Sequence, residues 1–274
     1  MPAIDLSGRV ALVTGASRGI GAAVGAAFAH AGANVGLAAR DHDALARLTI
    51  ELEPAKGTAI AIQADVTSPE DVALMVKRVV AEFGRLDFAC NNAAGGGHAP
   101  TPLAEVSTEA FDSGLAVSLR GVFLCLKNEI PAMLATGAGA IVNISSTAGL
   151  EAVGGLSAYC TAKHGVEGLT KVAALDYAAE GIRVNAIAPG PILTDNLKRA
   201  GDRAQQAAAA AMPVRRVGQP EEVAAAVVWL CSEQAAFITG TTLVIDGGKL
   251  AGTPPFQVRL DPTGSGHSRA SERR

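Results

Sequence analysis

The sequence predicts an α/β protein built on a doubly wound parallel sheet of about seven strands, with helices on both faces. Short aliphatic runs alternate with longer segments of helical periodicity over most of the 274 residues. The runs are apolar on both faces, which is typical of strands buried inside a parallel sheet. No linker rich in Gly, Pro or Ser interrupts residues 8–248. Uninterrupted alternation of strand and helix therefore predicts a single doubly wound domain.

The elements follow from these patterns in chain order. Strands are expected at residues 10–13, 34–39, 58–62, 86–90, 140–144, 183–187 and 242–245. Helices are expected at residues 19–32, 41–53, 69–83, 107–135, 157–180 and 220–232. The third helix has the clearest start signal, because Ser68 precedes Pro69 and two acidic residues. A serine cap followed by proline at the first helical position is typical of helix N-termini.

The end of the chain differs in composition from the rest. After Asp246-Gly247-Gly248 the periodicity fades, and residues 261–274 are a run of Gly, Ser and charged residues. Such a segment buries too little apolar surface to offset the entropy lost on ordering. We expect a domain over residues 1–252 and a loosely ordered C-terminal tail over residues 253–274.

Composition excludes several classes of function. Hydrophobic residues make up 49% of the chain, and the net charge of −3 argues against a broad basic face for nucleic acid. The N-terminus lacks the pattern of a signal peptide, and no apolar run is long enough to span a membrane. The four cysteines fit no zinc or redox spacing, so free thiols and no metal site are expected. These features predict a soluble, cytoplasmic protein without a nucleic-acid or membrane partner.

The first chemical signal is the run Thr14-Gly15-Ala16-Ser17-Arg18-Gly19-Ile20-Gly21, between the first strand and the first helix. Glycines let the backbone approach a pyrophosphate, and the helix N-terminus offers free N–H groups and a positive dipole end. By itself the spacing also fits an ordinary glycine-rich turn. Its position after the first strand of an alternating chain favours a dinucleotide site.

The second signal is Tyr159-Cys-Thr-Ala-Lys163, preceded by Ser146 at the end of a strand. Residues four apart share one helix face, and a nearby ammonium favours the phenolate form of tyrosine. The Ser146 hydroxyl could donate to a substrate oxygen. The alternative is a tyrosine and a lysine on an exposed helix surface.

Taken together, these motifs resemble the classical short-chain dehydrogenase/reductase family. The likeness covers residues 6–248, and its motifs occur in order: Thr14-Gly15-x3-Gly19-x-Gly21, Asp65-Val66, Asn91-Asn92-Ala93, Ser146, Tyr159-x3-Lys163, Asn185, Pro189-Gly190-x-Ile192-x-Thr194 and Asp246-Gly247-Gly248. The resemblance implies a Rossmann-like fold. It also implies an oxidoreductase that transfers a hydride between a nicotinamide cofactor and a secondary alcohol or ketone.

The resemblance assigns roles to individual residues. Tyr159 would be the general acid/base, Lys163 would lower its pKa and hold the nicotinamide ribose, and Ser146 would orient the substrate carbonyl. The cofactor-binding residues would be Gly15, Ser17, Arg18, Gly19, Ile20, Gly21, Arg40, Asp65, Val66, Asn91, Ala93, Tyr159, Lys163, Pro189, Gly190, Ile192 and Thr194.

Two positions depart from the family pattern. Ala94 stands where the family has glycine, and Ser118 stands where the family has an asparagine that holds a water in a proton relay. Ser118 is therefore a candidate catalytic residue, in a relay that its shorter side chain puts in doubt. A nucleotide-binding protein with weak or no turnover is the alternative to an active enzyme.

Cofactor choice depends on the end of the second strand. Family members that use NAD carry an acidic residue at the position of Ala39, which is followed here by Arg40, while Arg18 stands in the phosphate loop. Two guanidinium groups suit a 2′-phosphate, so NADP is expected. In the alternative, Arg40 is solvated, Asp41 binds the ribose diol and the cofactor is NAD.

The remaining expectations concern substrate and assembly. His98 is a possible substrate contact, and residues 195–212 form either a substrate lid or a plain surface helix. In the family, helices corresponding to 107–135 and 157–180 pair across a two-fold axis, which predicts a homodimer or homotetramer. The Ala- and Val-rich face of 220–232 agrees with close packing at such an interface. Substrate identity cannot be read from core motifs.

Overall fold

A computed structural model of the chain describes residues 4–53 and 55–252, and its strands form one parallel sheet. The strand order is β3-β2-β1-β4-β5-β6-β7. The strands are β1 (Val10–Thr14), β2 (Asn34–Ala39), β3 (Ala59–Gln63), β4 (Phe88–Asn91), β5 (Gly139–Ile144), β6 (Ile182–Pro189) and β7 (Thr242–Ile245). The predicted fold class is confirmed. The order reverses between β1 and β4, and in such sheets ligands bind at the carboxyl ends of the strands beside this point.

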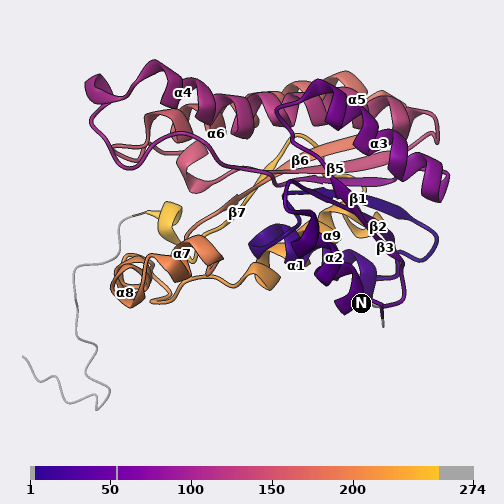
Figure 1. Cartoon of the computed structure of the whole chain (residues 1–274), viewed down its shortest axis with the longest axis horizontal. Helices are drawn as coiled ribbons and strands as arrows, with labels where there is room; N and C mark the ends of the chain where they lie inside the picture. Colours follow the sequence, from indigo (N-terminus) through magenta and orange to yellow (C-terminus); the bar gives the residue numbers. More distant parts are fainter. Residues whose placement is uncertain (1–3, 54, 253–274) are drawn as a thin grey trace, which may run out of the picture.

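Helices cover both faces of the sheet (Figure 1). They are α1 (Gly19–His30), α2 (His42–Glu51), α3 (Pro69–Phe83), α4 (Thr108–Leu115), α5 (Gly121–Leu134), α6 (Ser157–Tyr177), α7 (Asp195–Arg199), α8 (Asp202–Ala210) and α9 (Pro220–Cys231). Helices α1, α2 and α9 lie on one face, and α3 to α6 lie on the other. The start of α3 is as predicted, because Ser68 accepts the N–H of Asp71 at 3.1 Å and Pro69 opens the helix.

Residues 108–134 are helical without a break, as expected for the helix over 107–135, but the helix is not a regular α-helix throughout. A π-turn at Ala116–Arg120 separates α4 from α5. A π-turn inserts one residue into the helical ladder, and such turns are frequent at functional sites. Periodicity does not reveal it, because apolar residues continue on both sides. Residues 195–212 also differ from a single helix, since Gly201, at φ 85°, separates α7 from α8.

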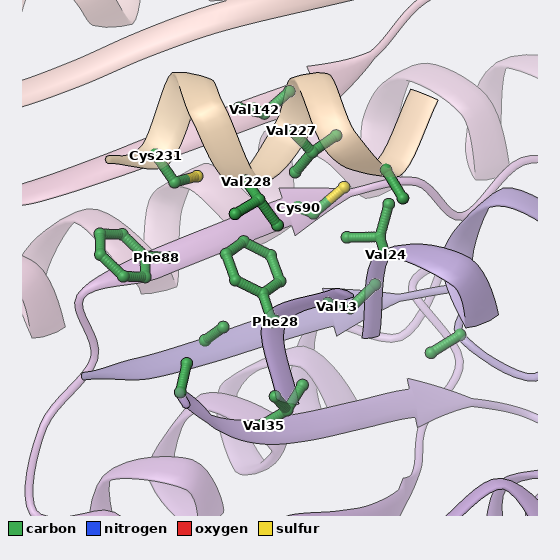
Figure 2. Packing of buried hydrophobic residues seen from close by; sticks show 14 of the residues in the cluster. Val13, Val24, Phe28, Val35, Phe88, Cys90, Val142, Val227, Val228 and Cys231 are labelled. Carbon is green, nitrogen blue, oxygen red and sulfur yellow. The ribbon is translucent and has the colours of Figure 1, made fainter. Parts of the chain in front are cut away.

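The largest apolar core joins α1 and α9 to the sheet (Figure 2). The rings of Phe28 and Phe88 stack with their centroids 5.9 Å apart. The valines of α9, including Val227 and Val228, are buried in this core. The apolar face of α9 is therefore used within the chain, and it gives no support to a subunit interface at 220–232.

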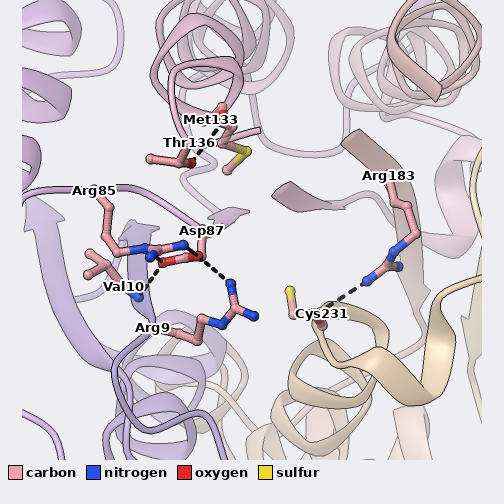
Figure 3. Close-up of polar contacts among 8 residues, drawn as sticks. All are labelled: Arg9, Val10, Arg85, Asp87, Met133, Thr136, Arg183 and Cys231. Carbon is pink, nitrogen blue, oxygen red and sulfur yellow. Dashed lines mark hydrogen bonds and ion pairs between the residues drawn. The ribbon is translucent and has the colours of Figure 1, made fainter. Parts of the chain in front are cut away.

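A buried carboxylate, Asp87, joins neighbouring strands at their amino-terminal ends. Asp87 accepts hydrogen bonds from Arg9 at 2.9 Å, from the guanidinium of Arg85, and from the backbone N–H of Val10 at 2.9 Å (Figure 3). On the same edge, Arg183 donates to the carbonyl of Leu230 at 2.7 Å. These contacts join β1 to β4 and, separately, β6 to α9, at the end opposite the motif residues.

The described part of the chain has no helix that is long and apolar enough to cross a membrane. Within residues 4–53 and 55–252, no group of three or more His, Cys, Asp or Glu side chains could hold a metal ion. The expected C-terminal tail, residues 253–274, lies outside the described residues.

Candidate active site

A cleft of about 320 Å³ opens at the carboxyl ends of β1 to β4. The sequence-predicted residues that line it are Gly15, Ser17, Arg18, Gly19, Ile20, Arg40, Asp65, Val66, Ala93 and Thr194. It is also lined by residues that had no predicted role: Ala38, Ala64, Asn92, Val117, Asp195 and Asn196. Segments that follow β1, β2, β3, β4 and β6 thus meet around one cleft.

The glycine-rich loop owes its shape to close backbone packing. Gly15 and Gly19 adopt φ values of 65° and 57°, which other residues rarely adopt. A Cβ at Gly21 would lie 2.3 Å from the Gly15 carbonyl oxygen, so Gly21 shapes the loop rather than lining the cleft. Arg18, the residue before α1, provides no side-chain cap, which leaves the N–H groups of the first turn open to an anion.

Asn92 holds this loop in place. Its Nδ2 donates to the carbonyls of Thr14 at 3.0 Å and Gly15 at 3.2 Å. The Thr14 hydroxyl in turn accepts the N–H groups of Asn92 and Ala93 at 3.1 and 3.2 Å. The signal available in the sequence was the Asn-Asn-Ala run at a strand end, but only the paired strands show which carbonyls it reaches.

Asn91 lies beneath the cleft rather than on its surface. It is buried, and its Nδ2 donates to Glu129 at 3.0 Å and to Asn143 at 3.1 Å. Asn143 donates onward to Thr170 of α6 at 3.0 Å. Burial raises the pKa of Glu129 to about 7, against the lowering effect of the Asn91 hydrogen bond. No sequence motif indicates this network, which links β4, β5, α5 and α6.

Two arginines flank the far end of the cleft. Arg18 and Arg40 are both exposed and both line it, together with Ala39 and Asp41. One oxygen of Asp41 accepts the N–H of Ala44 at 3.0 Å and caps α2. On the next strand, hydrogen bonds from Thr67 hold the pKa of Asp65 below its usual value. This end of the cleft therefore combines two exposed cations with carboxylates already engaged in local turns.

The proposed reacting groups gather on α6 and at the end of β5. Ser146 accepts the N–H of Ala148 at 3.1 Å, and its hydroxyl lies close enough to Tyr159 to lower the pKa of the phenol. Tyr159 keeps 36% of its surface exposed, so a substrate can reach it. Lys163 is buried one turn further along, and its Nζ donates to the Ile144 carbonyl at 2.7 Å.

Burial dominates the electrostatics of this group. Burial raises the pKa of Tyr159, while the Ser146 hydrogen bond opposes that rise. Burial lowers the pKa of Lys163 to about 8, and the carboxylate of Glu167 opposes that change. Lys163 is not a leading cause of the shift in the Tyr159 pKa, and the lowering expected beside a bound cofactor stays a prediction. The ammonium lies 5.7 Å from the ring centroid and is directed at a backbone carbonyl, so desolvation of the phenol dominates.

The segment after β6 closes the cleft from the other side. Pro189 ends β6, and Gly190 donates to the Ile245 carbonyl at 2.9 Å. Ile192 is buried and packs beside Gly218, where a Cβ would lie 2.6 Å from its side chain. Thr194 lines the cleft next to Gly19, and a Cβ on Gly19 would lie 3.2 Å from the Thr194 methyl group.

Comparisons with known proteins identify this arrangement. A family model described as "Enoyl-(Acyl carrier protein) reductase" matches residues 15–249. An A-factor type gamma-butyrolactone 1'-reductase (1S-forming) of Streptomyces virginiae is 47% identical over 248 residues, covering 89% of this chain and 96% of the relative. The chain belongs to the short-chain dehydrogenase/reductase family.

Two further likenesses agree with this assignment. A 2,5-dichloro-2,5-cyclohexadiene-1,4-diol dehydrogenase of Sphingobium indicum is 42% identical over 248 residues, covering 89% of this chain and 98% of the relative. The crystal structure of a short-chain type dehydrogenase/reductase from Mycobacterium marinum superposes with a TM-score of 0.85 at 35% identity. It covers 91% of this chain and 98% of that one. The chain is thus a member of an oxidoreductase family along almost its whole described length.

The two departures from the short-chain dehydrogenase/reductase pattern have structural accounts. Among the described residues other than glycine, only Arg215 has a positive φ. Ala94 therefore has an ordinary backbone conformation, and its methyl group causes no backbone strain. Ser118 lies in the π-turn; its hydroxyl donates to the Gly95 carbonyl at 3.2 Å and accepts the Gly95 N–H at 3.4 Å. Ser118 and Tyr159 line a common cavity of about 190 Å³. The serine therefore anchors the loop after β4.

Proposed function

We propose that this protein is an NADP(H)-dependent oxidoreductase that interconverts a secondary alcohol and a ketone by hydride transfer. The observation that carries the proposal is the grouping of Ser146, Tyr159 and Lys163 beside a cleft whose shape suits a dinucleotide. The cleft fits such a cofactor because a glycine-rich loop, an uncapped helix start and two arginines line one continuous space. When bound, NADPH supplies the hydride.

The chain's own residues would handle the proton. With its raised pKa, Tyr159 is protonated at neutral pH, which is the form that can donate to a ketone oxygen during reduction. Ser146, whose hydroxyl lies beside the phenol, is placed to hold the same oxygen. Lys163 uses one donor on Ile144 and keeps the others for the cofactor ribose.

The test of this mechanism is turnover by the purified protein and its Tyr159→Phe variant. Reduction of a panel of ketones is followed by the loss of NADPH absorbance. Tyr159→Phe removes the proton donor and keeps the ring, so turnover is expected to disappear while NADPH binding stays within two-fold. Tyr177→Phe, at the other end of α6, is the matched control. Binding without turnover by the unmodified protein would favour a nucleotide-binding function instead.

The names of the relatives direct the choice of substrates. A butyrolactone reductase and a cyclohexadiene-diol dehydrogenase both act on ring compounds, by their names. We therefore propose secondary alcohols of ring compounds, on the ring or on its side chain, and the matching ketones as the first substrate class to examine. Turnover confined to open-chain ketones would contradict this choice without affecting the mechanism.

Cofactor preference is proposed from the two arginines. Arg18 and Arg40 line the cleft beside Ala39, the position itself carries no carboxylate, and the carboxylate of Asp41 at the same end already caps α2. NADPH should bind more tightly than NADH, and Arg40→Ala should weaken NADPH binding selectively. Equal weakening of both cofactors, or a preference of the unmodified protein for NADH, would instead favour NAD and a diol contact from Asp41.

A homodimer or homotetramer is proposed from the surface of α5 and α6. Phe123, Val172 and Leu175 are exposed over 47%, 57% and 83% of their surfaces. An apolar hollow of about 560 Å³ lies between these helices and the π-turn. A second copy of the chain would cover this surface. Light scattering that gives the mass of a monomer at micromolar concentration would refute the proposal.

A further inference from the structure

The helix that carries the proposed acid/base residue starts without a cap of its own. Helix α6 begins at Ser157, and the preceding residue, Leu156, makes no side-chain hydrogen bond to the first turn. The first turn of a helix leaves backbone N–H groups without partners inside the helix. Tyr159 belongs to this turn, so the order of the turn determines where the phenol lies.

A side chain from a loop some sixty residues away takes the place of that cap. The Nε2 atom of His98 lies 3.2 Å from the Ser157 hydroxyl and 3.5 Å from the backbone N of Ala158. Its Nδ1 lies 2.8 Å from the carbonyl oxygen of Ala99. A backbone N–H only donates and a carbonyl oxygen only accepts, which places the ring proton on Nδ1 and the lone pair on Nε2. The Nε2 atom of His98 is therefore an acceptor at the positive end of α6.

The loop that presents His98 is held at both of its ends. Ser118 bonds both backbone groups of Gly95 at its start. At its far end, the N–H of Thr101 donates to the carbonyl of Gly155 at 3.0 Å, just before α6. The position of the imidazole is thus fixed relative to the helix.

We propose that His98 is a positioning residue that caps α6 through Nε2 and so holds Tyr159 in place for proton transfer. This inference rests on the function proposed for Tyr159, which lines the same cavity of about 190 Å³ as His98. Lys163 has a separate support in the Ile144 carbonyl. Loss of the cap therefore loosens the tyrosine without releasing the lysine.

Two variants separate the acceptor from the bulk of the side chain. Glutamine carries an acceptor oxygen about as far from the backbone as Nε2, whereas leucine carries none. A capping acceptor contributes about 1 kcal/mol, which corresponds to a roughly five-fold change in rate. We expect His98→Leu to lower kcat about five-fold with NADPH affinity unchanged, and His98→Gln to restore most of the loss. His30→Leu is the control, because the ring of His30 hydrogen-bonds to the Ala26 carbonyl of its own helix and not to α6 among the described residues.

Hydrogen exchange measured by mass spectrometry gives a readout that needs no turnover. Peptides covering residues 156–162 should take up deuterium faster in His98→Leu than in the unmodified protein, and at a near-normal rate in His98→Gln. Unchanged uptake in His98→Leu, equal losses in both variants, or a raised KM for the ketone at constant kcat would each overturn the proposal. If the unmodified protein turns over no ketone, the proposed function fails, and the exchange comparison still upholds or overturns the cap by itself.

Discussion

Glu129 offers a test of the buried polar network beneath the cleft. Its carboxylate is fully buried, and one oxygen accepts the Asn91 amide at 3.0 Å. The other oxygen has no hydrogen-bond partner within the described residues. Burial without full compensation raises the pKa of this group from 4.5 to about 7. The change Glu129→Gln keeps the shape and the acceptor but removes the ability to ionise.

The sign and size of the effect follow from proton linkage. When the pKa of a carboxyl group is higher in the folded state, its contribution to stability is fully present at pH values below the unfolded pKa, which is 4.5 for Glu129. That contribution is lost as the pH rises through about 7. At 1.36 kcal/mol per pH unit, the loss between pH 5 and pH 9 is about 2–3 kcal/mol. The amide introduced by Glu129→Gln has no such loss, so the variant should gain stability relative to the parent as the pH rises.

The assay is guanidinium unfolding of the parent and the variant at pH 5, 7 and 9. One protein concentration is used throughout, because the proposed subunit association would also contribute to stability. The quantity of interest is the difference in unfolding free energy between the two proteins, in which the other titrating groups cancel. Between pH 5 and pH 9, this difference in unfolding free energy should grow by about 2–3 kcal/mol in favour of the variant. Glu82→Gln, on the exposed side of α3, should give a flat difference. If the difference for Glu129→Gln does not change with pH, burial does not raise the pKa of this carboxyl group, and the reasoning is refuted.

Three further changes test other parts of the structure. Gly21→Ala places a methyl group within 2.3 Å of the Gly15 carbonyl oxygen, so cofactor titration should show at least ten-fold weaker binding. Asn92→Ala removes two bonds to the same loop, at about 1 kcal/mol each, and should weaken cofactor binding about ten-fold or more in the same titration. Asp87→Asn weakens the contacts with Arg9 at the opposite edge, so thermal unfolding should show a loss of about 2 kcal/mol with cofactor affinity unchanged.

The fold could be predicted because the signals that set it are local. The run Asn34–Ala39 and the helix Pro69–Phe83 have the bounds expected from apolar patterning and capping. Other elements end within a few residues of the prediction. The π-turn Ala116–Arg120 could not be predicted from the sequence, because an inserted residue changes the helical hydrogen bonds without changing the apolar pattern.

The site could be predicted in part for a different reason. Parallel strands bring their carboxyl ends together, so residues that follow β1, β2, β3 and β4 had to line a common edge. The network of Asn91, Glu129 and Asn143 could not be foreseen, because each pair lies far apart in sequence. The electrostatics of Tyr159 could not be foreseen either, since the extent of burial decides the direction in which the pKa moves.

The motif Tyr159-x3-Lys163 supplies the proposed reacting groups, but their positions depend on contacts made by the whole of α6. Lys163 is held by the Ile144 carbonyl of β5, and the start of the helix is capped by His98. Further along, the buried carboxylate of Glu167 accepts the hydroxyl of Thr242 on the edge strand β7. These supports come from a strand, a loop and the sheet edge, each remote in sequence from the helix. A substitution at any of them can therefore change turnover while leaving every residue of the motif intact.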